Sequence, residues 1–201
     1  MKPLIAKSLQ DYAEYYFSKS MYVYPYSGNK IDWNEWKHQV QNAEDLKSYT
    51  WDTFEGISLV AGKKGIRVLK FMNIEEMGIM KVFIIVKEAL DMLHLPEDYP
   101  WIVLTSNSIS IIVESADDIQ GMGNRSYTGR KDMKIGYTIL IWQEYLTLPS
   151  TNPRIHFLSI FPNEMPMHVT NANIIKCLDH FMEKNYFEDL ERMMTVLGLG
   201  H

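Results

Sequence analysis

The chain has 201 residues and a formal net charge of −5, with 46% hydrophobic and 22% charged residues. These proportions are ordinary for a globular protein with a core of normal size. The acidic balance argues against strong nonspecific binding of DNA or RNA, which needs clustered cations. The longest apolar runs, such as Val82 to Val86, are too short to span a membrane.

The first seven residues, MKPLIAK, lack the apolar core and cleavage site of a signal peptide. The single cysteine, Cys177, excludes an intramolecular disulfide and fits a reducing compartment. We therefore expect a cytoplasmic protein with no membrane segment. The sequence leaves its oligomeric state open.

The predicted elements alternate between helices and strands. Apolar residues at helical spacing predict helices over 7–17, with Ser8 as a cap, and over 33–41, 43–49, 75–95, 174–181 and 188–196. Strand patterns cover 22–26, 56–61, 66–72, 101–104, 109–114, 137–142, 145–148 and 156–161. Hairpin-like pairs of strands favour an α+β fold with a mixed, largely antiparallel sheet and flanking helices. We predict one domain over 1–201, with C-terminal helices at about 172–197 packed on it.

Two connections between these elements are basic. Gly62 to Gly65, with Lys63 and Lys64 between the glycines, predicts a turn that uses positive φ. The stretch from 125 to 134 carries four cations, Arg125, Arg130, Lys131 and Lys134. We predict an exposed loop there, because charge runs are usually solvated.

Four stretches of the chain show a family-like order and spacing. They are KIDWNEWKHQ (30–39), GISLVAGKKGIRVLKF (56–71), LHLPEDYPWIVLTSNSISIIVE (93–114) and ILIWQEYLTLPSTNPRIHFLSIF (139–161). Together they resemble the primase–polymerase domain of the archaeo-eukaryotic primase superfamily, of the bifunctional DNA primase/polymerase N-terminal type. That domain occurs in replication proteins of plasmids, phages and mobile elements. The resemblance covers roughly residues 15–181 and implies a primase–polymerase core with an RRM-like sheet.

The positions that carry the family's chemistry differ in this chain. In active members an Asp-x-Asp pair and a third acidic residue hold two metal ions, since Mg²⁺ prefers carboxylate oxygens. The metal positions fall on Lys70, Met72 and either Ile139 or Ile141. A phosphate-contacting His falls on Ser110, a second His falls on Asn152, and residues 105–108 replace a glycine-rich loop. The resemblance therefore implies a catalytically degenerate domain without a metal or other cofactor.

From this resemblance we expect a replication-associated accessory module of a mobile element, not an enzyme, whose partner is nucleic acid or a replication protein. The candidate phosphate-binding residues are Lys63, Lys64, Lys70, Arg125, Arg130, Lys131, Lys134 and Asn152. Lys70 would either replace the metal charge and hold a phosphate, or pair with Glu114 or another acid.

Other interpretations stay open. An active nucleotidyltransferase could use relocated acids, Glu75, Glu76 and Glu114, although acids are also common at the start of a helix. A protein-interaction or immunity-type domain would need no nucleic acid. Cys177 and His180 have the spacing of half a zinc site, but no second Cys could complete it, and we expect a buried core thiol beside a surface His.

Overall fold

The computed structural model describes residues 8–27, 40–61, 64–72, 79–115, 125–128, 136–140, 145–151, 154–158, 161–182 and 186–198. The helices are α1 (Leu9–Ser18), α3 (Ala43–Ser48), the short 3-10 turn η1 (Trp51–Thr53), α4 (Ile79–Leu93), α5 (Asn171–Met182) and α6 (Tyr186–Val196). The strands are β1 (Val23–Tyr26), β2 (Gly56–Val60), β3 (Ile66–Met72), β4 (Ile102–Leu104), β5 (Ser108–Glu114), β6 (Arg125–Thr128), β7 (Gly136–Leu140), β8 (Tyr145–Leu148) and β9 (His156–Phe157).

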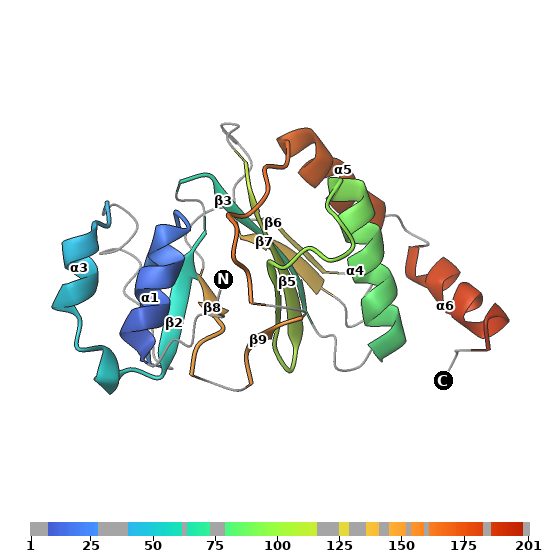
Figure 1. Ribbon diagram of the computed structural model, residues 1–201. Helices are drawn as coiled ribbons and strands as arrows, with labels where there is room; N and C mark the ends of the chain where they lie inside the picture. Colours follow the sequence, from blue (N-terminus) through green and yellow to red (C-terminus); the bar gives the residue numbers. More distant parts are fainter. Residues whose placement is uncertain are drawn as a thin grey trace.

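The strands form two antiparallel sheets, which confirms an α+β fold. The smaller sheet has the order β1-β2-β8, and the larger has the order β6-β7-β3-β5-β4-β9. Figure 1 shows the layers: α1 and α3 lie beside the small sheet, the large sheet follows, and α4 and α5 cover its far side. The division of the chain into domains stays a prediction.

The centre of the large sheet is a split β-α-β unit. β3 and β4 are both antiparallel to β5, which lies between them, so β3 and β4 run parallel to each other. Parallel strands need a crossover, and α4 supplies it. Strands β3, β4 and β5 follow one another along the chain, and β7 comes after β6, to give the spatial order β7-β3-β5-β4.

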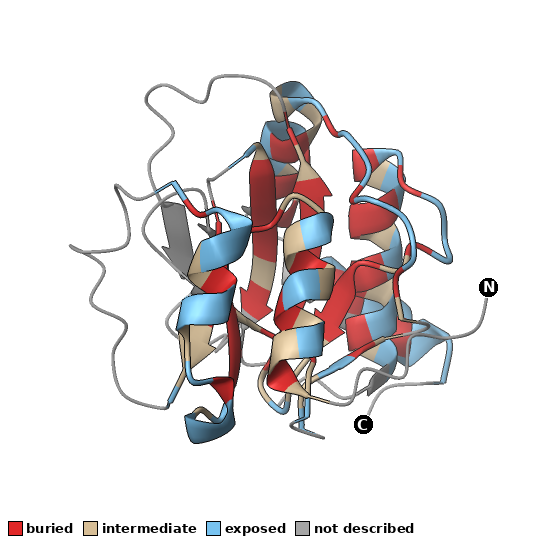
Figure 2. Cartoon of the chain, turned by 60° about the vertical axis from the view of Figure 1, so that its left-hand side comes forward, coloured by how far each residue is buried: buried red, intermediate tan, exposed pale blue. Residues whose placement is uncertain are grey.

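Strand alternation divides β3 between the two faces of the large sheet. Phe71 points toward the helical face, where its ring lies 5.3 Å from the ring of Phe181 on α5. Ile66 and Val68 belong to the opposite face and are completely buried. Lys70 is the next residue on that face, so it points toward the side where the small sheet lies. Figure 2 shows that burial is concentrated in the strands and that exposed residues lie on the outer sides of the helices.

Aromatic rings join α1 to the large sheet. Tyr16 on α1 is fully buried, and its ring lies 6.4 Å from that of Trp101 just before β4. Phe161 packs against the same helix, 4.9 Å from the ring of Tyr15. Tyr16 also donates a hydrogen bond from its hydroxyl to the carbonyl of Pro149, directly after β8. One helix therefore contacts parts of both sheets.

The connection from β2 to β3 is a turn, as predicted, but it does not close a hairpin. β2 pairs with β1 and β8, whereas β3 pairs with β5 and β7. Lys64 and Gly65 adopt φ values of 47° and 76°. A Cβ on Gly65 would lie 2.9 Å from the carbonyl oxygen of Ser115, so both the conformation and the close approach require glycine. The turn passes the chain from one sheet to the other.

Two other predicted elements need correction. Residues Arg125–Thr128 of the predicted basic loop form edge strand β6 and pair with β7. Of the strand predicted over 156–161, the described residues form the two-residue β9, which pairs with β4, and Leu158 is no longer in a strand. The helix predicted over 33–41 lies almost entirely outside the described residues, and Val40 and Gln41 are not helical.

Gln41 closes part of the outer edge of β1. Its side-chain oxygen accepts a hydrogen bond from the Val23 N–H at 2.8 Å, and its Nε2 donates to the Val23 carbonyl at 2.6 Å. The amide thus makes both hydrogen bonds that a neighbouring strand would make. Gln41 is only 4% exposed, so these bonds are shielded from water.

Candidate functional site

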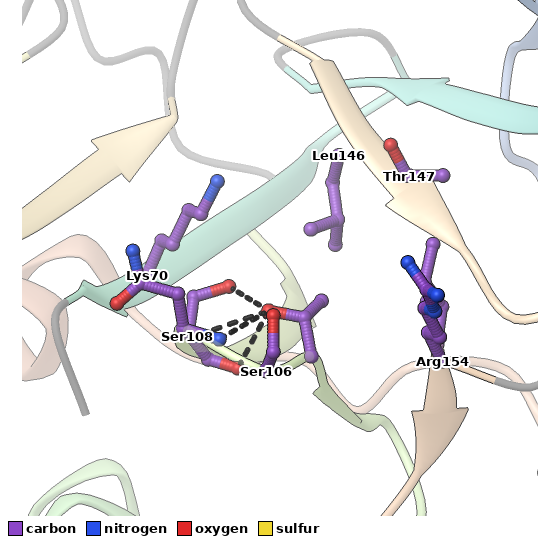
Figure 3. Close-up of a pocket in the computed structure, with 9 residues that line it drawn as sticks. Lys70, Ser106, Ser108, Leu146, Thr147 and Arg154 are labelled. Carbon is purple, nitrogen blue, oxygen red and sulfur yellow. Dashed lines mark hydrogen bonds between the residues drawn. The ribbon is translucent and has the colours of Figure 1, made fainter. Parts of the chain in front are cut away.

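A pocket of about 330 Å³ opens between the large sheet and β8 of the small sheet. It is lined by Lys70, Thr105, Ser106, Asn107, Ser108, Leu146, Thr147, Arg154 and Ile155. In Figure 3, Lys70 on β3 and Arg154 lie on opposite sides of this space, with Leu146 and Thr147 on β8 and the serines on the loop below. We call it the Lys70–Arg154 pocket.

The position of Lys70 follows from the register of β3. Lys70 pairs with Ser110 on β5 and with Thr138 on β7. Val68, two residues earlier on the same face, pairs with Ile112 and is buried between apolar neighbours. The face is therefore apolar at Val68 and becomes polar at the half-buried Lys70, where the pocket begins.

The loop between β4 and β5 supplies most of the hydroxyl groups. Thr105 Oγ1 accepts hydrogen bonds from the backbone N–H groups of Asn107 and Ser108, at 3.3 and 3.0 Å. It also lies 2.8 Å from Ser108 Oγ. No residue from 105 to 108 has positive φ, so this tight turn needs no glycine. The side chain of Thr105 therefore holds the loop in a fixed shape.

Two buried polar atoms in this region lack a hydrogen-bond partner within the described chain, Asn107 Oδ1 and Ser110 Oγ. Asn107 lines the pocket, and Ser110 lies directly opposite Lys70 on the neighbouring strand. A buried polar group without a partner costs about 1–3 kcal/mol. The Ser110 hydroxyl could donate to a bound acceptor, whereas Asn107 Oδ1 only accepts and would need a donor from a bound molecule or water.

Lys70 and Arg154 are the basic side chains of the pocket, and each also interacts with other parts of the chain. Two of the nine lining residues are basic, and none of the nine is a carboxylate. Leu146 is buried and Ile155 half-buried, so part of the wall is apolar and weakens the screening by water. Such a pocket favours an anion with several oxygen atoms, because Arg and hydroxyl groups donate hydrogen bonds to them.

The structure brings together some of the positions to which the resemblance assigns the lost chemistry. Lys70 and Ser110 are direct partners across two strands, and Met72 pairs with Ser108, so these four form one corner of the sheet. Ile139 pairs with Leu69, one position out of step, and Thr138 is the partner of Lys70. The side chains of Met72 and Ile139 lie outside the described part of the structure.

The other candidate cations are not gathered at the pocket. Lys64 lies in the turn before β3, and four strand steps, about 13 Å, separate Ile66 at the start of β3 from Lys70. The Lys64 ammonium lies over the rings of Phe17 and Tyr22, 4.9 and 4.8 Å from their centroids. Arg125 begins edge strand β6, and only its backbone is described. The remaining candidates, Lys63, Arg130, Lys131, Lys134 and Asn152, lie outside the described residues.

Relocated metal ligands also receive no support from the residues that can be placed. Glu114 pairs with Ile66, at the other end of β3 from Met72. Glu75 and Glu76 lie outside the described ranges. Within those ranges no three His, Cys, Asp or Glu side chains are grouped so that they could hold a metal ion.

Cys177 is a fully buried thiol on α5. Burial raises its pKa to about 12, so the thiol is neutral near pH 7. His180, one turn later, instead faces α4, where its Nε2 lies 3.4 Å from Glu88 Oε2. The two side chains therefore do not act as a pair.

Sequence reasoning missed Arg154, Thr147 and Ile155 as parts of the site. Arg154 follows directly after the stretch PSTNP, which was already recognised as a family position. A cation next to that stretch was the available signal. Thr147 and Ile155 carry no such signal, because only the packing of β8 near β3 makes them neighbours of Lys70.

No protein-family model matches the chain, and no curated protein sequence matches it. Among the helices that the structure describes, none is long and apolar enough to cross a lipid bilayer.

Proposed function

We propose that this protein is a non-catalytic domain with a primase–polymerase-like core, which binds a phosphate-bearing partner in the Lys70–Arg154 pocket as an accessory to replication of a mobile element. The partner is a nucleic acid or a nucleotide. The observation that carries this proposal is the pocket itself: among the described residues that line it are two basic and four hydroxyl side chains, and none of these described residues is a carboxylate.

The strand order supports the choice of core. The run β3-α4-β4-β5 followed by β7, in the spatial order β7-β3-β5-β4, has the β-α-β-β pattern of ferredoxin-like sheets. The pattern departs in one respect: the residues described between β5 and β7 form strand β6 rather than a second helix. Helix α5, from near the C-terminus, packs beside α4 instead.

The place of the pocket supports the choice of ligand. Lys70 stands where the resemblance puts a metal-binding Asp, and Ser110 stands where it puts a phosphate-contacting His. A Lys or Arg can hold a phosphate directly. A lysine at the position of a metal ligand therefore suits a domain that binds a phosphate without catalysing nucleotidyl transfer. The same exchange removes the oxygen ligands that two-metal catalysis requires.

Binding of a fluorescent single-stranded oligonucleotide at low salt, measured by anisotropy in the presence of EDTA, tests this proposal. We expect Lys70→Met and Arg154→Met each to weaken binding about tenfold or more, because a charge-assisted hydrogen bond contributes about 1.5–3 kcal/mol. Lys176→Met, on exposed α5 surface, is the matched control and should bind like the wild type.

Three results would overturn the proposal. Template-directed nucleotide incorporation with Mg²⁺ or Mn²⁺ would show that the domain is catalytic. Equal binding by the wild type and both pocket variants would move the ligand elsewhere. Failure to retain any phosphate-bearing ligand at low salt would favour a protein-interaction domain.

A further inference from the structure

We propose that the main chain of Thr147, at the free edge of β8, binds the Watson–Crick edge of an unpaired nucleobase in the Lys70–Arg154 pocket. This inference rests on the proposed function and names the group of the ligand that the pocket reads. It implies that single-stranded nucleic acid binds and that a duplex does not. The source of the base is either a free nucleotide or a single strand.

The pocket lies against one edge of β8. Leu146 and Thr147 are consecutive residues of this strand, and both line the pocket. Consecutive strand residues point to opposite faces of a sheet, so a space that touches both lies beside the edge of the strand. β2 occupies the other edge of β8, which leaves the free edge for the pocket. Figure 3 shows both residues on β8 where the strand borders this space.

The hydrogen-bond ladder of the small sheet fixes which peptide groups of β8 point outward. In an antiparallel pair, successive residues turn their N–H and C=O groups alternately toward and away from the partner strand. Val23 on β1 turns these groups away from β2, toward Gln41. Its partner Leu59 therefore turns its own groups toward β8, where they meet Leu146. Thr147, the next residue, turns both its N–H and its C=O toward the free edge.

The outward N–H and C=O of Thr147 are a donor and an acceptor that the described part of the chain leaves unused. Apart from the ladder with β2, no hydrogen bond joins Thr147 to another residue in the described ranges. Thr147 is half-buried and lines the pocket, so a molecule in the pocket reaches these atoms. A planar group with an acceptor beside a donor is complementary to them.

Gln41 shows how such a pair is bound elsewhere on the same sheet. Its planar amide accepts from the Val23 N–H at 2.8 Å and donates to the Val23 carbonyl at 2.6 Å. Val23 and Thr147 are outward-facing residues of the two edge strands of this sheet. An unpaired nucleobase resembles the amide, because its Watson–Crick edge also has a donor beside an acceptor. In a duplex the partner base occupies both.

The free edge suits one planar group better than an added peptide strand. β8 has four residues, and alternation leaves at most two of them facing outward. Pro149, directly after β8, has no N–H, and its carbonyl already accepts a hydrogen bond from the Tyr16 hydroxyl. The pocket of about 330 Å³ is near the lower end of the range for small-molecule sites, about 300–1,000 Å³. Leu146 and Ile155 supply apolar surface for the flat faces of a base.

A modified ligand tests the inference without changing the protein. Anisotropy in EDTA at low salt compares fluorescent oligothymidine with the same oligomer methylated at N3 of every base. Methylation removes the Watson–Crick donor and leaves every phosphate unchanged, so we expect binding to weaken about tenfold. Oligodeoxyuridine, which differs from oligothymidine only at C5, is the matched control and should bind within about threefold. Annealing oligothymidine to its complement should weaken binding at least about tenfold.

A variant tests the same contact from the side of the protein. Thr147→Pro removes an outward N–H and no ladder bond, and Pro25 already occupies an outward-facing position on β1. We expect this variant to bind the methylated and unmethylated oligomers equally, whereas Thr147→Val, which keeps the N–H, should still distinguish them. The comparison of ligands on the wild type decides the matter if Thr147→Pro fails to fold.

Competition by thymidine 5′-monophosphate identifies the source of the base. Displacement of the oligomer by this nucleotide, but not by its N3-methyl derivative, means that a free nucleotide is sufficient, and no displacement by either means that the base must belong to a strand.

Equal binding of methylated and unmethylated oligomers by the wild type would overturn this inference, even if Thr147→Pro binds weakly, because the edge would then take another group. Equal binding of duplex and single strand would also overturn it. The proposed function would survive both results if Lys70→Met and Arg154→Met still weaken binding. The absence of all binding would overturn both proposals.

Discussion

The neighbours of Lys70 show how far single residues in a sequence predict which side chains meet in the fold. Lys70, Met72 and Ser110 were placed in one site by resemblance, and the register of β3 and β5 does bring them together. Ile139 pairs with Leu69, so Thr138 and not Ile139 is the partner of Lys70 on β7. A slip of one residue moves a strand position to the other face, and both Thr138 and Ile139 fit a strand pattern, so the sequence alone does not fix this register.

At the same scale, Cys177 gives a prediction about pH. Burial raises the pKa of its thiol to about 12 in the folded protein, against about 8.5 in an unfolded chain. Above about pH 8.5 the unfolded state therefore loses this proton while the folded state keeps it. The free energy of unfolding should fall by about 1.4 kcal/mol per pH unit from this group as the pH rises from about 9 to 11.

Urea denaturation at several pH values measures this effect, with Cys177→Ala as the reference. Other groups titrate in both proteins, so the difference between their pH profiles isolates the thiol. Parallel profiles would contradict the prediction. The thiol of the folded wild type should also resist iodoacetamide at pH 8, because the reactive thiolate is scarce.

At the scale of elements, the end of α4 shows how local signals specify structure. His94 has φ of 57°, its N–H donates to the Asp91 carbonyl at 3.1 Å, and the Leu95 N–H donates to the Leu90 carbonyl at 2.9 Å. These two bonds define a Schellman motif, and Pro96 follows it. The motif satisfies carbonyl groups that the helix end would otherwise leave unpaired.

We predict that His94→Gly stabilises the protein by about 0.5–1 kcal/mol. A side chain in the left-handed region costs about 1–2 kcal/mol, and the greater freedom of glycine in the unfolded chain returns part of that gain. Asp91→Gly, in the last turn of the same helix, is the contrasting variant and should destabilise by about 1 kcal/mol. Thermal denaturation compares the two, and a lower midpoint for His94→Gly would refute the prediction.

Periodicity and caps predicted most elements because both signals are local. Ser8 caps α1 as expected, accepting a hydrogen bond from the Asp11 N–H at 3.2 Å. The turn at Gly65 was also predicted, but not that β2 and β3 join different sheets, because a turn signal does not specify the partners of the strands beside it. Arg125 to Thr128 was mistaken for a loop because its charge concealed an edge strand, where charged residues are common.

At the scale of the molecule, the relation between the two sheets determines the pocket. Lys70 comes from one sheet, and Thr147 comes from the other. No local pattern predicts that β8 lies beside β3, since this depends on packing across more than seventy residues of sequence. The sequence therefore pointed to Lys70 and offered a weaker signal for Arg154 beside PSTNP, but only the fold places the two in one pocket.

The hydroxyl of Tyr16 gives the prediction that belongs to this scale. It joins α1 to the end of β8 through the Pro149 carbonyl, in a buried setting. Tyr16→Phe should lower the free energy of unfolding by about 1–3 kcal/mol, because the carbonyl loses its partner without water to replace it.

Tyr12→Phe on the same helix is the matched control. The Tyr12 ring packs 6.5 Å from that of Tyr16, but its hydroxyl bonds to no residue in the part of the chain that is described. It should change stability by less than about 0.5 kcal/mol. Equal losses in urea denaturation of the two variants would show that the Pro149 contact contributes nothing specific.

The amide of Gln41 has a consequence for how copies of this protein meet one another. Unpaired peptide groups along an outermost strand are a template for a strand of another molecule, and thus for aggregation. On β1 the outward-facing groups of Val23 are occupied by Gln41, and Pro25, two residues later, has no N–H to offer. This border of the small sheet is therefore closed at Val23 and has no N–H donor at Pro25, which discourages growth into larger assemblies through β1.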